Sequence, residues 1–195
     1  MKNLILLLLL FTLNSVYAAH YHLFSTQGKE STPNSNYNKI IDHLGIGDTI
    51  EFSNHKTIRL GQRLDTKAAD SDKGARTAIF EIKDAPEYVI RIPLIIEERD
   101  GISETINGYK DLEYLNKNIV KLIDGSNNEY VIVSKIPKKH YTFLDLIMKK
   151  SISEVTRIKM LSSLMDFSRL TSRFSELGDF HTTQFIYDIE QNQWI

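Results

Sequence analysis

The residues best suited to chemistry lie near the end of the chain, where Asp179 and Gln184 flank four residues, Phe180 to Thr183. A long helical pattern precedes this stretch, and the apolar residues Phe185 to Tyr187 follow it. A carboxylate in such a loop can take the proton of an attacking hydroxyl group, and a side-chain amide can hold a metal ion. In the alternative interpretation, Gly178 ends the helix and Asp179 is only a turn residue before a hairpin. The rest of the chain has to decide between the two.

The composition excludes several classes of protein. The 195 residues are 42% hydrophobic and 25% charged, which is typical of a globular chain with one or two cores. A formal net charge of -1 provides no attraction to nucleic acid or to an acidic membrane surface. Because the chain has no cysteine, a disulfide scaffold, a thiol nucleophile and a cysteine metal site are excluded.

Two further patterns are missing from the sequence. The 6 histidines are scattered, and no pair has the His-x-x-x-His or Glu-x-x-His spacing of a metal site. There is no Gly-x-Ser-x-Gly segment either, which argues against a Ser-His-Asp hydrolase.

The N-terminus predicts a cleaved signal peptide over residues 1–18. Lys2 supplies the positive charge, Leu4 to Leu13 form the apolar region, and Val16-Tyr17-Ala18 fits the small-residue cleavage pattern. Cleavage between Ala18 and Ala19 would give a secreted or periplasmic chain and, by removing Lys2, would change the net charge from -1 to -2. The apolar run is short for a bilayer span, so we expect no stable membrane anchor; a retained anchor is the alternative.

The mature chain then divides into a lead-in and a strand-rich region. Residues 19–48 are polar and predict a flexible lead-in that includes one short helix, Tyr37 to Leu44. Residues 49–136 contain short runs of β-branched and aromatic residues between turn residues, and these runs predict strands. The runs are Thr49–Phe52, Thr57–Leu60, Thr77–Ile82, Tyr88–Pro93, Asn118–Asp124 and Glu129–Ile136.

One predicted helix lies between the predicted strands, and helical patterns predominate in residues 137–195. The interrupting helix has its apolar residues on one face: Ile102, Ile106, Tyr109, Leu112 and Leu115. After a hinge at Pro137 to His140, Thr142 caps a short helix, and a capping box, Ser151 to Glu154, opens a long one. The apolar positions that we expect to face the core in this long helix are Val155, Ile158, Leu161, Leu164, Met165, Leu170 and Phe174.

In this order, the elements and the loop resemble the protein-kinase-like superfamily. The most similar branches are aminoglycoside phosphotransferases, whose loop reads Asp-Leu-His-x-x-Asn, and secretory-pathway kinases, where Asp-Phe-x-x-x-Gln-Phe variants occur. The resemblance covers about Ile50 to Ile195. It implies an α+β fold, with a five-stranded antiparallel N-lobe sheet and helix C over residues 49–136, and the first helices of a mostly helical C-lobe over residues 137–195.

The resemblance also implies roles for individual residues. Asp179 would be the catalytic base and Gln184 the amide ligand of the metal. Arg91 stands where the family has the lysine that binds the nucleotide phosphates; the alternatives are that it fills the nucleotide site or is an outward strand residue. Glu104, which we prefer to Glu113, stands where helix C supplies the partner of that lysine, and a surface glutamate is the alternative. The implied cofactors are ATP and Mg²⁺, and the implied partners are the nucleotide and a hydroxyl acceptor, which is a protein or a small molecule.

The chain departs from the family pattern in several ways. Gly61 and Gly74 stand in the region of the glycine-rich nucleotide loop but do not make Gly-x-Gly-x-x-Gly, and a solvated hairpin loop is the alternative. Arg91 replaces a lysine with a larger, planar group, and Gln184 replaces an asparagine. The chain stops at Ile195, just before the Asp-Phe-Gly-like triad whose Asp binds the metal.

The sequence therefore leaves three hypotheses. The first is a secreted kinase-like phosphotransferase, truncated before the triad. The second is a degenerate, catalytically inactive pseudokinase that acts as a binding module. The third is an unrelated α+β protein of the cell envelope.

Overall fold

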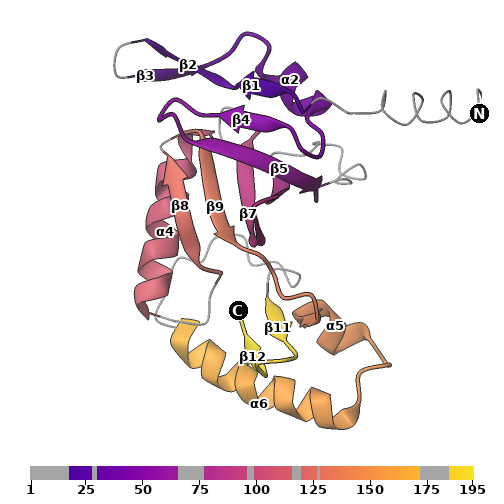
Figure 1. The fold of residues 1–195 in the computed structure, drawn as a ribbon. Helices are drawn as coiled ribbons and strands as arrows, with labels where there is room; N and C mark the ends of the chain where they lie inside the picture. The colour runs from indigo at the N-terminus through magenta and orange to yellow at the C-terminus, as the bar shows by residue number, and fades with distance from the viewer. Residues whose placement is uncertain are drawn as a thin grey trace, which may run out of the picture.

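The computed structural model describes residues 18–27, 30–65, 77–95, 99–115, 120–126, 128–171 and 185–195. In these residues, a seven-stranded sheet forms the larger part of the fold, and a three-stranded sheet with two helices forms the smaller part (Figure 1). Across the large sheet, the strands are β1 (His20–His22), β4 (Thr49–Glu51), β5 (Thr57–Arg63), β6 (Thr77–Ile82), β7 (Ala85–Pro93), β9 (Tyr130–Ser134) and β8 (Leu122–Ser126).

The connections within the large sheet match the order expected from the sequence. Strands β5, β6 and β7 are consecutive and antiparallel, and helix α4 (Ile102–Leu115) follows them. The chain then enters β8 and returns along β9, which pairs with both β7 and β8. The α+β class is therefore confirmed, as is the order of five antiparallel strands with one helix between the third and the fourth.

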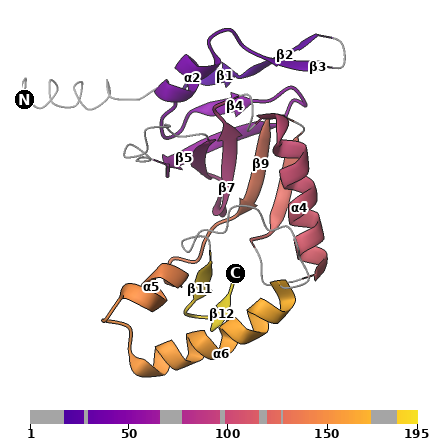
Figure 2. The same cartoon turned by 180° about the vertical axis from the view of Figure 1, so that it is seen from behind.

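The large sheet buries apolar side chains on both faces, as its inner strand β7 shows. On β7, Ile90 and Ile92 join the larger core, whereas Val89 packs into a second cluster with Ile102 and Ile106 of α4. Figures 1 and 2 show α4 running along β8 and β9 on one side of the sheet. Successive residues of a strand point to opposite faces, so each face needs its own apolar layer.

The described residues between 19 and 48 are folded, which differs from the flexible lead-in expected from their polar composition. Strand β1 pairs in parallel with β4, β2 (Phe24–Gln27) forms a hairpin with β3 (Glu30–Pro33), and the expected short helix is α2 (Tyr37–His43). Leu23 and Ile41 are fully buried in the larger core. A few buried apolar side chains hold this segment in the fold, although its composition as a whole is polar.

The smaller part of the fold follows the hinge. Strands β10 (His140–Thr142), β11 (Ile186–Asp188) and β12 (Gln193–Trp194) form its sheet, and α5 (Phe143–Met148) and α6 (Glu154–Thr171) are its helices. The indole of Trp194 donates a hydrogen bond of 2.8 Å to the Met160 carbonyl and packs in a core with Leu146, Ile152 and Tyr187. Thr142 and Asp145 form a capping box at the start of α5, so the expected cap at Thr142 is confirmed.

Helix α6 turns a different face to the core than most of its sequence pattern suggested. Met160 is buried against Trp194, and Leu164 packs against the same core as expected. Val155, Ile158, Leu161 and Met165 are instead between 49% and 66% exposed, and Phe174 lies outside the described residues. Its first turn is capped by Ser153, which accepts a hydrogen bond from the Thr156 amide, and not by Ser151. No helix among the described residues has both the length and the apolar character needed to cross a bilayer.

The burial of residue 23 provides a test of the folded N-terminal segment. We expect Leu23→Ala to lower the free energy of unfolding by about 2–5 kcal/mol, because the side chain is fully buried and its removal leaves a cavity. Urea denaturation followed by circular dichroism measures this change. Ile46→Ala is the matched control, since Ile46 is 68% exposed; equal effects of the two changes would contradict a folded segment.

Candidate functional site

Arg91 lies near the end of β7, two residues before Pro93, on the face of the sheet that α4 covers. Its neighbours across the strands are Ile79 on β6 and Val131 on β9. Its guanidinium is half-buried and donates a 3.3 Å hydrogen bond from Nη1 to the Tyr109 hydroxyl. A small cavity opens beside it, and its lining residues are Thr77, Arg91, Pro93, Ile102, Thr105 and Val131.

Glu104 does not pair with Arg91. The side of α4 that faces the sheet carries Ile102 and Ile106, and Glu104, two residues after Ile102, is exposed. Two residues correspond to about 200° of rotation around an α-helix, which turns this carboxylate away from the strands. The side chains that α4 presents to Arg91 are Thr105 and Tyr109. The nucleotide-binding role of Glu104 stays a prediction, without the ion pair expected for it.

Gly61 lies within β5, and its neighbours explain why a glycine is needed there. A Cβ atom at this position would lie 2.8 Å from Cβ of Glu81 and 3.3 Å from the Glu81 carbonyl oxygen on β6. The register between β5 and β6 also shifts between Leu60 and Arg63. Close approach of two strands therefore accounts for this glycine. Gly74 lies outside the described residues, and the binding of a nucleotide at either glycine stays a prediction.

Asp65, which sequence reasoning did not single out, anchors the chain where β5 ends. Its two carboxylate oxygens accept hydrogen bonds of 2.9 and 3.0 Å from the Arg63 guanidinium, and Oδ1 also accepts one of 3.1 Å from the Ile79 amide. Burial alone would raise the pKa of Asp65, but the hydrogen bonds from Arg63 and Ile79 outweigh it and hold this pKa below 3.8. The carboxylate thus joins the end of β5 to β6, next to the region of the expected nucleotide loop.

Asp179 and Gln184 lie outside the described residues, but the elements before and after this stretch are defined. Helix α6 ends at Thr171, and the described chain resumes at Phe185, directly before the β11–β12 hairpin. The Phe185 carbonyl, directly after Gln184 in sequence, accepts a 3.0 Å hydrogen bond from the Phe143 amide at the start of α5. Phe185 therefore lies next to the start of the first helix after the hinge. The catalytic and metal-binding roles of Asp179 and Gln184 stay predictions.

Solved structures of aminoglycoside phosphotransferases are similar to this chain. The complex of APH(2″)-IIa with streptomycin and ATP aligns with a TM-score of 0.45 and 14% identity over 76% of this chain and 42% of that one. The gentamicin complex of APH(2″)-IIa aligns with a TM-score of 0.46 and 13% identity over 75% of this chain and 42% of that one. APH(2″)-Ib with bound ADP aligns with a TM-score of 0.45 and 15% identity over 73% of this chain and 40% of that one.

The chain thus spans about two fifths of the length of these structures. No protein-family model and no curated protein matches the sequence.

The bonds of Asp65 predict a pH dependence of stability. The pKa of this carboxyl is lower in the folded chain than its ordinary value of 3.8, so its ionised form stabilises the fold above that value. This contribution is lost as the pH falls through the folded pKa. We expect Asp65→Asn to be destabilising at pH 7, and we expect its difference from the wild type to shrink below pH 3.8. Urea denaturation at several pH values measures this; a difference that does not vary with pH contradicts it.

Proposed function

We propose that the chain contains the nucleotide-binding region and the catalytic loop of a secreted, protein-kinase-like phosphotransferase. The observation that carries the proposal is the strand order β5-β6-β7-β9-β8, with α4 inserted between β7 and β8. This is the order that the family resemblance predicts for an N-lobe with its helix C. The two helices α5 and α6 then follow the hinge in the expected sequence.

The position of Arg91 is compatible with a nucleotide phosphate. Its strand and face are those expected for the phosphate-binding residue, since it lies on the third strand of the order and faces the inserted helix. Among the described residues, its polar partner is a neutral hydroxyl and not a carboxylate. A half-buried guanidinium is stabilised by an anion, and its planar fork suits a phosphate.

The loop residues would supply the chemistry. Asp179 would take the proton of the acceptor hydroxyl, and Gln184 would hold Mg²⁺, which offsets negative charge on the phosphates of ATP when bound. The acceptor would be a hydroxyl group of a protein or of a small molecule.

One contact near the start of the described chain bears on the proposed secretion. The Ala19 amide donates a 2.8 Å hydrogen bond to Oδ1 of Asp48, whose carboxylate is mostly buried. Cleavage between Ala18 and Ala19 would convert this amide to an ammonium group, and the same contact would become a charge-assisted hydrogen bond. The mass of the exported chain identifies the cleavage point.

A pseudokinase that binds nucleotide without turnover is the second candidate. The observation that favours it is the exposed Glu104, because an active kinase needs the ion pair between helix C and the third strand. The replacements at positions 91 and 184 point in the same direction.

Nucleotide binding is the first test of the proposal. We expect Mg·ATP to bind the exported protein in isothermal titration calorimetry. We expect Arg91→Ala to weaken binding by roughly 10- to 100-fold, because the change removes a charged hydrogen bond. Arg59→Ala is the matched control, because Arg59 is an exposed arginine on β5. No binding by the wild type, or equal binding by Arg91→Ala, contradicts the nucleotide site.

Turnover separates the two candidates. For an active enzyme, we expect Asp179→Asn to leave Mg·ATP affinity unchanged and to lower phosphate release from ATP by roughly 100-fold or more, because the base is lost. Asp84→Asn, in the exposed turn between β6 and β7, serves as the control. A wild type that binds Mg·ATP but turns over no faster than Asp179→Asn identifies a pseudokinase.

A further inference from the structure

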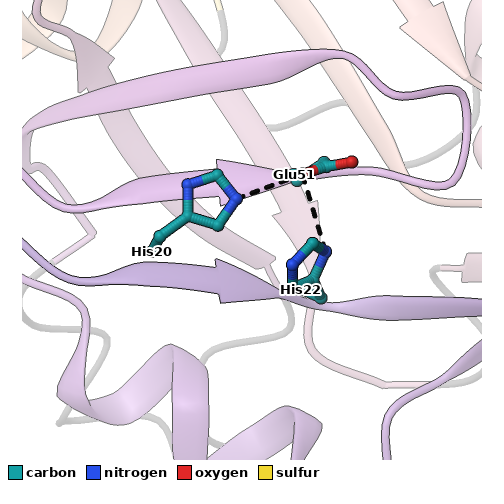
Figure 3. Close-up of side chains that lie close together, drawn as sticks. All are labelled: His20, His22 and Glu51. Atoms are coloured by element: carbon teal, nitrogen blue, oxygen red, sulfur yellow. Dashed lines mark hydrogen bonds and ion pairs between the residues drawn. The ribbon is translucent and has the colours of Figure 1, made fainter.

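Three side chains with metal-binding groups meet at the β1 edge of the large sheet, on other strands than Arg91. His20 and His22 alternate along β1 and so point to the same face, and the parallel pairing places His22 opposite Glu51 of β4. Figure 3 shows both imidazole rings directed at the carboxylate. Oε2 of Glu51 lies 3.1 Å from Nε2 of His20 and 3.7 Å from Nδ1 of His22.

These separations are close to those of a metal coordination shell. Two ligand atoms on one tetrahedral zinc ion, each about 2.0–2.2 Å from it, lie roughly 3.3–3.6 Å apart. The two distances to Glu51 lie on either side of that range, and all three ligand atoms lie within 4.8 Å of one another. Both imidazole side chains are partly exposed, at 47% and 63%, so small rotations of the rings suffice to bring the set around one ion.

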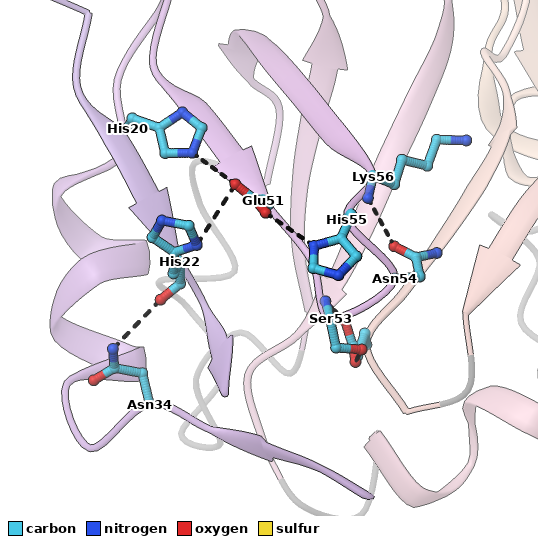
Figure 4. A network of polar contacts seen from close by, with 9 residues as sticks. His20, His22, Asn34, Glu51, Ser53, Asn54, His55 and Lys56 are labelled. Carbon is cyan, nitrogen blue, oxygen red and sulfur yellow. Dashed lines mark hydrogen bonds and ion pairs between the residues drawn. The ribbon is translucent and has the colours of Figure 1, made fainter. Parts of the chain in front are cut away.

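The carboxylate at the centre of the cluster is held from its other side. Oε1 of Glu51 lies 3.3 Å from Nδ1 of His55, which is in the turn between β4 and β5 (Figure 4). That turn is fixed by backbone hydrogen bonds within it and by the Ser53 amide, which donates a 3.0 Å hydrogen bond to the buried Glu129. One oxygen of Glu51 therefore faces the two histidines of β1, and the other oxygen has an orienting partner.

Contacts on both sides of the two histidines also hold the backbone of β1 in place. The Thr49 amide donates a 2.8 Å hydrogen bond to the Ala19 carbonyl on one side of the two histidines. Leu23, directly after them, is fully buried. A ligand set on two paired strands with fixed ends requires little reorganisation to bind an ion, which is a condition for a specific metal site.

A hydrogen-bonded surface cluster is the simpler explanation, but it accounts poorly for the number of histidines around Glu51. Three of the 6 histidines of the chain surround one carboxylate. Exposed ion pairs contribute little to stability, which gives a weak reason to gather three imidazoles there. Imidazole and carboxylate together are a ligand set that zinc and neighbouring divalent transition metals prefer.

We propose that His20, His22 and Glu51 bind one divalent transition-metal ion, zinc in the first instance, and that His55 positions Glu51. The three ligands leave one coordination position open towards solvent for water or an external ligand. The bound ion would fasten β1, the first strand of the described chain, to β4. This proposal does not depend on the nucleotide site, because none of its residues belongs to that site.

Titration with Zn²⁺ alone tests the proposal. The protein carries no histidine tag, is freed of metal with a chelator, and is studied by calorimetry and by thermal unfolding. We expect one Zn²⁺ per chain and a rise in melting temperature that the chelator reverses, since an ion that binds only the folded state stabilises it. The absence of saturable binding, or binding without a rise in melting temperature, overturns the proposal.

Variants locate the ion. We expect His22→Asn and Glu51→Gln each to abolish saturable binding, and we expect His55→Asn to weaken it roughly 10- to 100-fold, as for a residue that orients a ligand. His43→Asn is the matched control, since His43 is an exposed histidine on α2 outside the cluster. Full affinity in His22→Asn, or an equal loss in His43→Asn, overturns the assignment.

A spectroscopic measurement distinguishes the loss of metal binding in these variants from a loss of structure. Each variant should melt like the wild type in the absence of metal, because its contacts are exposed ion pairs. Co²⁺ bound to the wild type should show the intense visible absorption of four-coordinate cobalt, and His22→Asn should lack it. The weak spectrum of six-coordinate cobalt in the wild type would overturn the proposed geometry.

Discussion

Strand β7 carries apolar side chains on both faces, and the fold depends on covering each of them. Val89 needs an apolar neighbour on one side, and Ile90 and Ile92 need one on the other. Burying a side chain of this size is worth about 1.5–3 kcal/mol, so two uncovered faces would cost a large part of the stability of a domain. Helix α4 covers the first face, and Leu23, Ile41 and their neighbours contribute to the second.

Arg91 is the exception to this apolar pattern, and its position follows from the same alternation. It shares the α4 face with Val89, where the helix excludes part of the solvent that a guanidinium needs. Tyr109 satisfies one of its donors. Thr77, the first residue of β6, lines the same cavity, so the chain enters β6 next to Arg91. Under the proposed function, a nucleotide phosphate would approach this charge beside the start of β6.

The N-terminal segment has two roles in the structure. Its apolar residues complete the cover of the sheet, and its strand β1 extends the sheet beyond β4. The exposed side of β1 then carries two histidines next to the carboxylate of β4. Arg91 on β7 and the proposed metal site on β1 and β4 therefore lie on different strands of one sheet.

The sequence by itself determined the local elements of this protein. The bounds of β6, the start of α4 and the cap of α5 at Thr142 were predictable, because alternation, helical periodicity and capping act between residues close in the chain. Only the tertiary structure decided which faces are used: that Met160 of α6 is buried while Val155 is exposed, and that Glu104 points away from Arg91. It also decided that His20 meets Glu51, 31 residues later, a contact without any local signal. Such contacts arise from strand pairing and from burial, which depend on parts of the chain that are far apart in sequence.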